Sequence, residues 1–288
     1  MTKLCVCGLG LMGAEIAGRL HDAGHEVTVW NRTPEKAVNL MRRGLIRSSS
    51  PAEAAAGAAG AITMLADPTA LDEVVTGPSG LAEALEPGST LIEMSTVGPG
   101  AIRRLAGRLP PGVDLIDAPV LGSVAQVRDR ALKIFVGGDT EAFERWQPLL
   151  TELGTPRHLG PLGSGAAMKL VTNLVLGALM TTLGEALTLA DGLELRQADV
   201  LDVLQESPIG ATTRGKRERI ESGRYPPNFR LALARKDLDL IAGAAAERGI
   251  PLKVSLAART WFEDAEEAGL GELDYSAVIP HLRGRKLE

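Results

Sequence analysis

The first half of the chain alternates short apolar, often β-branched runs with longer Ala-rich amphipathic stretches. Runs of this length predict strands, and the stretches between them have the periodicity of helices. Strands joined by such helices form βαβ units, which assemble into a doubly wound parallel sheet that binds ligands at the carboxyl ends of its strands. The predicted strands are Leu4–Cys7, Val27–Trp30, Ala61–Leu65, Thr90–Met94, Leu115–Ile116 and Leu132–Val136.

Past these strands the pattern becomes helical. A long apolar segment, Ala166 to Leu195, predicts a buried helix. Its charge-free part, Leu170 to Leu183, is shorter than the about 20 residues of a bilayer span, so we expect no membrane association. Proline and glycine residues divide the rest into several helices. We therefore predict an α/β domain over residues 1–162 and an all-α domain over residues 163–288.

Composition narrows the class of partner. The chain has 288 residues, of which 45% are hydrophobic and 23% charged, and this is enough material for two folded domains. A net charge of -5 argues against nucleic-acid binding and favours a small-molecule partner. Cys5 and Cys7 alternate within the first predicted strand, and the four histidines are scattered, so we expect no metal site. No export signal precedes the first strand, which predicts a cytoplasmic protein.

A glycine-rich motif follows the first predicted strand directly and opens a helix. Gly8 permits the tight turn, Gly10 lets the backbone approach a pyrophosphate, and Gly13 allows close packing of the helix on the strand. The helix N-terminus adds amide donors for the phosphates. An ordinary glycine turn is the alternative, but the strand-to-helix context favours a Rossmann dinucleotide-binding domain. The motif consists of Gly8, Leu9, Gly10, Leu11, Met12 and Gly13.

The end of the second predicted strand bears on the choice of cofactor. An NAD enzyme usually has an acidic residue there, which accepts hydrogen bonds from the ribose hydroxyls. This chain instead reads Asn31, Arg32 and Thr33, and a guanidinium forms charge-assisted hydrogen bonds with a 2′-phosphate that a carboxylate would repel. These residues predict NADP (NADPH). The alternative is that Arg32 is an exposed arginine in a turn.

Five motifs follow one another in order along nearly the whole chain. They are Gly8–Gly13, Ser95-Thr96-Val97, Asp117-Ala118-Pro119-Val120, Gly165–Asn173 and Lys236-Asp237-Leu238. In this order they resemble the β-hydroxyacid dehydrogenase family, which includes 3-hydroxyisobutyrate dehydrogenases, tartronate semialdehyde reductases and plant-type glyoxylate/succinic semialdehyde reductases. The resemblance implies a Rossmann domain followed by a helical domain that completes the active site.

Lys169 matches the family's catalytic lysine, and Asn173 matches its partner four positions later on one face of a helix. Reduction of a carbonyl needs a proton on oxygen as hydride reaches carbon. A lysine partly desolvated in a cleft has a lowered pKa that suits this general-acid role. The alternative is a structural lysine whose ammonium extends from a buried helix to solvent.

The resemblance also implies roles for residues on either side of this helix. Thr96 matches a residue near the nicotinamide, and Leu65 and Ala66 end the third strand where the loop beside the adenosine passes. Lys236 matches a lysine that reaches the cofactor from the helical domain and Asp237 would orient it, unless the pair is merely part of an exposed helix face. Phe229 would form a wall of the substrate pocket.

The substrate loop departs from the family pattern. After Val120 the family has a serine followed by glycine, but this chain reads Leu121, Gly122 and Ser123. Backbone amides of this loop would still bind a substrate carboxylate, and Ser123 would supply a displaced hydroxyl. The segment from Val124 to Arg130 also lacks the family's small residues, so the identity of the substrate does not transfer.

These features predict an NADPH-dependent oxidoreductase that interconverts a small hydroxyacid and its semialdehyde or keto acid, with Lys169 as general acid/base. One alternative is an imine reductase on the same fold, although such enzymes generally replace the lysine. Another is a non-catalytic NADP-binding scaffold, since some family members have lost the lysine. The family's habit and the apolar helical domain predict a homodimer or homotetramer.

Overall fold

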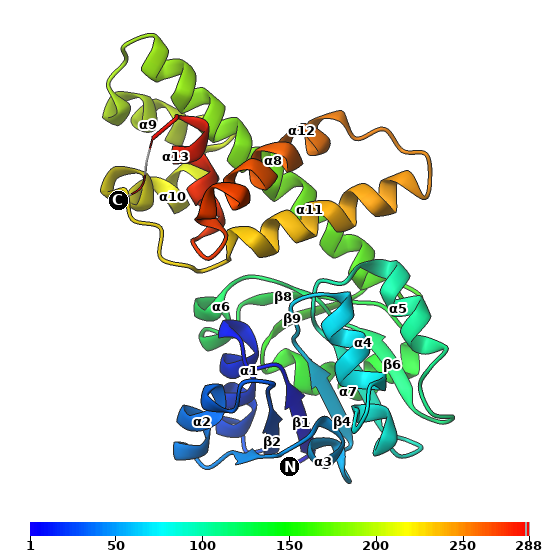
Figure 1. Cartoon of the computed structure of the whole chain (residues 1–288). Helices are drawn as coiled ribbons and strands as arrows, with labels where there is room; N and C mark the ends of the chain where they lie inside the picture. Colours follow the sequence, from blue (N-terminus) through cyan, green and yellow to red (C-terminus); the bar gives the residue numbers. More distant parts are fainter. Residues whose placement is uncertain (286, 288) are drawn as a thin grey trace. The chain divides into compact units, whose positions relative to one another are not determined.

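The computed structural model describes residues 1–285 and 287, and the chain forms two compact units (Figure 1). The first unit comprises Met1–Leu170 and contains every described strand, and the second begins at Val171. Helix α8, Ser164–Gly192, contributes its first residues to the first unit and its remaining residues to the second.

Six parallel strands form the main sheet of the first unit, in the order β3-β2-β1-β4-β5-β6. Leu4 of the central strand β1 lies opposite Val27 of β2 and Gly60 of β4. The order of strands therefore reverses between β1 and β4, which is where doubly wound sheets bind their ligands. The prediction of a doubly wound parallel sheet is confirmed. The strands are β1 (Lys3–Cys7), β2 (Glu26–Trp30), β3 (Ile46–Arg47), β4 (Gly60–Thr63), β5 (Thr90–Glu93) and β6 (Asp114–Asp117).

Two apolar cores cover the two faces of this sheet, because successive side chains of a strand point to opposite faces. Leu4 and Val6 belong to one core, whereas Cys5 and Cys7 belong to the other and are fully buried free thiols. The helices and turns that surround the strands of this unit are α1 (Leu11–Asp22), η1 (Pro34–Ala37), α2 (Val38–Arg42), α3 (Pro51–Ala55), α4 (Pro68–Thr76), η2 (Leu81–Glu83), α5 (Gly98–Ala106), α6 (Val124–Arg128) and α7 (Thr140–Thr151).

A second, three-stranded sheet contains the last of the predicted strands. Strand β8 (Leu132–Val136) pairs antiparallel with β7 (Val120–Leu121) and parallel with β9 (Gly154–His158). Its assignment to the main parallel sheet was therefore wrong. The physical reason is its pattern, since Lys133 is exposed between buried neighbours, whereas β1, β4 and β5 are buried almost throughout.

The described residues of the second unit form helices and connecting loops with no strand, as predicted. The long helix α8 exceeds the charge-free run considered above, and its most apolar 18-residue window has a mean hydropathy of 1.5. The helix is long and apolar enough to cross a membrane by length and composition alone. Core helices share these properties, and 44% of that window is buried. The other helices are α9 (Gln197–Gln205), α10 (Gly210–Ser222), α11 (Leu231–Ala246), α12 (Lys253–Ala265), η3 (Glu266–Leu270), η4 (Tyr275–Ala277) and α13 (Val278–Leu282).

Candidate functional site

The glycine loop between β1 and α1 has three glycines with different surroundings. Gly8 has a φ of +99°, and a Cβ there would lie 2.3 Å from the Met64 carbonyl oxygen. A Cβ on Gly13 would lie 1.9 Å from the Gly8 oxygen, so this close approach of helix to loop requires glycine. At Gly10, by contrast, a Cβ would meet no protein atom within 4 Å. Packing therefore explains Gly8 and Gly13, while Gly10 leaves open space beside the backbone.

The N-terminus of α1 is suited to an anion. Gly10 occupies the N-cap position without a side-chain cap, and the first turn contains no acidic residue. The first amides of a helix lack partners within the helix, and its dipole favours negative charge there. Leu9 is buried in the core and Leu11 is largely exposed, so the loop offers mainly backbone donors to a ligand. These features fit a dinucleotide pyrophosphate.

Asn31 shapes the glycine loop as well as the turn after β2. Its Oδ1 atom accepts a hydrogen bond from the Leu9 amide at 2.8 Å, and its Nδ2 group donates to the Thr33 carbonyl at 2.9 Å. Asn31 thus joins the ends of β1 and β2, a role the sequence analysis did not assign. Arg32 and Thr33 are exposed beside it, and the guanidinium is available to a phosphate.

The ends of β4 and β5 are joined in a similar way. The Ser95 hydroxyl accepts a hydrogen bond from the Leu65 amide at 2.8 Å, and the Ser95 amide donates to Glu93 Oε1 at 2.8 Å. Ser95 is buried, so it supports the backbone on which Leu65 and Thr96 lie. Ser95 was predicted only as part of a motif. The sequence signal for its role in joining the two strand ends is a hydroxyl at the end of a buried strand. Ala66 is exposed just beyond.

The substrate-loop residues predicted from the resemblance lie at the end of β7. Leu121 is exposed, and Gly122 has a φ of +143°. The Ser123 hydroxyl donates to Gln126 Oε1 at 2.6 Å, which ties it to the start of α6. Arg128 makes two hydrogen bonds with Glu15 of α1, at 2.9 and 3.1 Å. Its charge is therefore already compensated within the first unit.

Lys169 and Asn173 both lie on α8, one turn apart, as predicted. Lys169 is half-buried and Asn173 is buried. In the second unit the Asn173 amide group donates to Asp237 Oδ2 at 2.6 Å, and Lys236 Nζ lies 2.7 Å from Asp237 Oδ1. The Asp237 carboxylate therefore bridges an amide and an ammonium. The Lys236–Asp237 contact joins neighbours within one predicted motif, whereas the Asn173–Asp237 hydrogen bond joins residues 64 apart and was not predicted.

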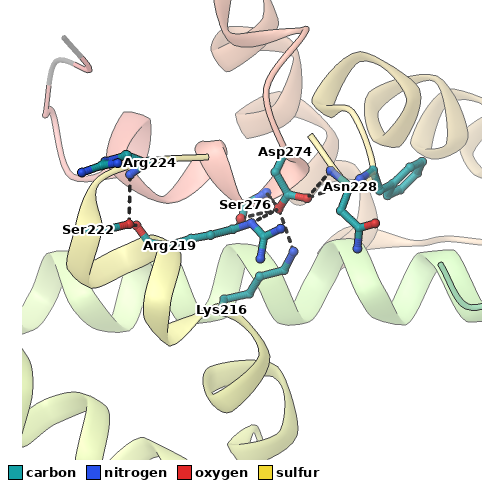
Figure 2. Close-up of polar contacts among 8 residues, drawn as sticks. Lys216, Arg219, Ser222, Arg224, Asn228, Asp274 and Ser276 are labelled. Atoms are coloured by element: carbon teal, nitrogen blue, oxygen red, sulfur yellow. Dashed lines mark hydrogen bonds and ion pairs between the residues drawn. The ribbon is translucent and has the colours of Figure 1, made fainter. Parts of the chain in front are cut away.

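A polar cluster of the second unit surrounds the buried carboxylate of Asp274, close to Asn228 (Figure 2). Asp274 Oδ2 accepts hydrogen bonds from the amides of Asn228 and Phe229, both at 3.3 Å. Its Oδ1 lies 2.7 Å from Lys216 Nζ and accepts a hydrogen bond from the Ser276 hydroxyl. This carboxylate therefore fixes the backbone that presents Phe229, just before α11 with Lys236 and Asp237. Asp274 lies outside the motifs described above.

Taken unit by unit, the strand ends of the first unit bring together the glycine loop, Asn31, Leu65 and Thr96. This arrangement defines a Rossmann dinucleotide-binding protein. Residues 3–168 match the family model described as NAD binding domain of 6-phosphogluconate dehydrogenase. Residues 163–282 match the model described as NAD-binding of NADP-dependent 3-hydroxyisobutyrate dehydrogenase. The chain belongs to the β-hydroxyacid dehydrogenase family of NAD(P)-dependent oxidoreductases, as its motifs predicted.

Similar proteins agree with this assignment. Glyoxylate/succinic semialdehyde reductase 1 of Arabidopsis thaliana is 36% identical over 282 residues, which cover 96% of each chain. The human cytokine-like nuclear factor N-PAC is 32% identical, and the match spans 96% of this chain but only 50% of that protein. Among solved structures, Mycobacterium tuberculosis 3-hydroxyisobutyrate dehydrogenase has a TM-score of 0.87 at 29% identity, covering 98% of this chain and 99% of its own.

Proposed function

We propose that the protein is an NADPH-dependent reductase of a small aldehyde or keto acid that also works in reverse as a hydroxyacid dehydrogenase. The observation that carries the proposal is the position of Lys169 on α8, one turn before an asparagine whose amide is held by Asp237. The full-length similarity to a glyoxylate/succinic semialdehyde reductase supports the same reaction class.

In this proposal Lys169 handles the proton. NADPH, when bound, supplies the hydride to the carbonyl carbon. The Lys169 ammonium gives a proton to the carbonyl oxygen, and in the reverse direction the amine takes the proton from the hydroxyl group. General acid–base catalysis of this kind typically contributes roughly 10²–10⁴-fold to the rate. Asn173, oriented by Asp237, would hold the substrate or the lysine in the position that proton transfer needs.

The preference for NADP rests on charge at the end of β2. Asn31 is neutral, and the exposed Arg32 is suited to a 2′-phosphate. The model matched by residues 163–282 is named for an NADP-dependent enzyme, and a structural neighbour of TM-score 0.84 at 27% identity, Psf3, was solved with NADP+. Gly8 to Gly13 would hold the pyrophosphate, and Leu65, Ala66 and Thr96 would line the rest of the cofactor. Lys236 would reach it from residues 163–288, the proposed substrate domain, while residues 1–162 form the cofactor domain.

We propose a substrate that carries a carboxylate, as glyoxylate and succinic semialdehyde do. Exposed Gly122 would offer its backbone amide to it, whereas Leu121 pairs with Lys133 of β8 and Arg128 is compensated by Glu15. Ser123 keeps an acceptor for a substrate hydroxyl because its own proton goes to Gln126.

The test is NADPH oxidation with a panel of glyoxylate, succinic semialdehyde, methylmalonate semialdehyde, tartronate semialdehyde and a cyclic imine. Turnover of one or more of the first four supports the proposal. Turnover of the imine alone would favour the imine-reductase alternative, for which the similarity of a reductive aminase from Aspergillus terreus, at 25% identity and a TM-score of 0.63, is the supporting observation. Tight NADPH binding with no turnover of any compound would favour the scaffold alternative.

We also propose a cytoplasmic homodimer or homotetramer. Large apolar side chains are exposed along α8, among them Val171, Val175 and Leu189 at 59%, 49% and 65%. Contact with a second copy would remove such a surface from water. Light scattering of the purified protein would give the mass of the assembly, and a monomer at all concentrations would contradict the proposal.

A further inference from the structure

Asp117, the last residue of β6, lies where three segments of the first unit meet. Its carboxylate is fully buried, and it accepts hydrogen bonds from the amides of Gly163 at 2.7 Å and Ala166 at 2.6 Å. Its backbone exchanges two hydrogen bonds with Gly137, at 3.0 and 2.8 Å. The carboxylate therefore joins the end of a strand of the main sheet to the first turn of α8.

Two glycines permit this close approach. A Cβ on Gly137 would lie 2.5 Å from Asp117 Oδ1, and a Cβ on Gly165 would lie 2.1 Å from the Phe135 carbonyl oxygen and 2.9 Å from Asp117 Oδ2. Side chains at these positions would displace the carboxylate or the helix. The start of α8 thus packs directly against backbone, with the carboxylate filling the space between.

Asp117 has an unusual position for a capping residue. Burial raises its pKa, although the backbone amides of Gly163 and Ala166 favour the charged form. The partly exposed Ser50 is a more usual cap, because its neutral hydroxyl accepts a hydrogen bond from the Glu53 amide at 3.1 Å at the start of the short helix α3. Two oxygens that accept from two separate amides instead fix both the depth and the rotation of the helix start.

We propose that Asp117 is a positioning residue for Lys169: by holding the amides of Gly163 and Ala166, it sets the rotation of α8 that presents the lysine to the substrate. Lys169 is three residues beyond Ala166, one helical turn along the same face. The inference rests on the proposed role of Lys169. Misplacement of a reacting group by about 1 Å costs roughly 10²-fold in rate, so a small rotation of this turn has a large effect.

The experiment is a double-mutant cycle between Asp117→Asn and Lys169→Ala in the full chain. The kcat of each variant is measured at high enzyme concentration, so that slow variants remain measurable. Asn keeps one acceptor oxygen but puts the NH2 group of its amide opposite a backbone N–H. We expect Asp117→Asn to lower kcat by up to about 10²-fold with an unchanged dissociation constant for NADPH. In the Lys169→Ala background the same substitution should have no further effect on kcat, because Asp117 acts through the lysine.

Two further variants complete the test. If Asp117→Asn prevents folding, Asp117→Ser retains one acceptor for the helix start, and it should lower kcat in the same lysine-dependent way. Ser50→Ala removes a helix cap elsewhere in the first unit and should leave kcat unchanged. An equal loss on replacing Asp117 in both backgrounds, or an unchanged kcat, would overturn the inference. If Lys169→Ala alone turned over at the wild-type rate, the proposed function itself would fail, and that result is distinct from a failure of the cycle.

Discussion

Asp117 in the first unit and Asp274 in the second are both fully buried, yet their pKa values move in opposite directions. Burial disfavours the charged form of each. Around Asp117 only backbone amides oppose that effect, and its pKa is raised. Around Asp274 burial is outweighed by the Lys216 ammonium and by the hydroxyl and amide of Ser276, and its pKa is lowered.

The difference shows two ways to fix a loop or helix near a site. Asp117 contacts amides that have a fixed direction, so it defines the orientation of a helix without compensating its own charge. Asp274 is half of an ion pair, and Arg219 Nε approaches it at 3.7 Å, so its surroundings are positively charged (Figure 2). The first arrangement controls geometry, and the second ties the Asn228–Phe229 backbone to α10 through Lys216.

The largest expected effect concerns α8, the helix whose first turn is held by Asp117. Lys169→Ala should lower kcat for a confirmed carbonyl substrate by roughly 10²-fold or more while leaving NADPH affinity nearly intact. Lys169→Arg should restore little, because a guanidinium keeps its proton at working pH. Stopped-flow reduction and NADPH fluorescence titration measure the two quantities. A near wild-type rate in the Ala variant would mean that α8 carries no proton donor.

The next effect would sharpen the contrast in the second unit. Asp274→Asn leaves Lys216 buried without its charge partner, and breaking a buried pair in this way costs about 3–5 kcal/mol of unfolding free energy. Adding Lys216→Met should recover much of that loss, whereas Asp117→Asn leaves no ammonium unpaired. Urea unfolding of the three variants gives the comparison. Equal losses for the single and double variants would show that the hydrogen bonds, and not the charge pair, stabilise this cluster.

A third prediction tests the proposed cofactor site in the first unit, where the charge of Arg32 should determine the affinity for NADPH. Arg32→Ala should weaken NADPH binding by about 10- to 100-fold, since a hydrogen bond to a charged group contributes about 1.5–3 kcal/mol, and should leave NADH binding almost unchanged. Isothermal titration with both cofactors measures this. Equal losses for NADPH and NADH would remove the argument for a 2′-phosphate contact.

The smallest effect is the pH dependence of the two carboxylates. The lowered pKa of Asp274 means that its contribution to stability is present above the unfolded value of about 4 and is lost as pH falls through the folded pKa. The raised pKa of Asp117 gives the opposite sign: its contribution is full below about pH 4 and declines as pH rises through the folded pKa. The difference in unfolding free energy between wild type and each Asn variant, measured by urea unfolding across acidic pH, should therefore change with pH in opposite directions for Asp117 and Asp274. Parallel slopes would contradict the comparison.

Sequence pattern predicted those parts of the molecule that depend on local signals. The glycine loop, the buried strands and the long apolar helix have strong periodicity or fixed spacing, and the family models confirm the nicotinamide-dinucleotide-binding class. The two-residue strands β3 and β7 are too short to produce a pattern, and β9 contains a proline and two basic residues. The alternation around Lys133 did indicate a half-buried strand, and this signal would have separated β8 from the main sheet.

The sequence motifs propose the residues of the candidate site but not the contacts among them. Lys169, Asn173 and Asp237 could be named from the sequence, but the hydrogen bond between Asn173 and Asp237 depends on how α8 and α11 pack. The contacts of Asp117 with Gly163 and Ala166 span more than 40 residues and form only after folding. Propensity describes neighbours along the chain, so it cannot identify such partners.

The open space at Gly10 means that stability and ligand binding make opposite demands on one methyl group. Its φ of -68° and ψ of -173° are accessible to any L-residue, and a Cβ there would meet no protein atom within 4 Å. An alanine would therefore stabilise the empty protein by about 0.4–1 kcal/mol, because it restricts the unfolded chain. In the proposed cofactor site the same methyl would stand where a pyrophosphate would approach the backbone. Selection for thermal stability alone would thus favour replacing this glycine, and only selection for cofactor binding would retain it.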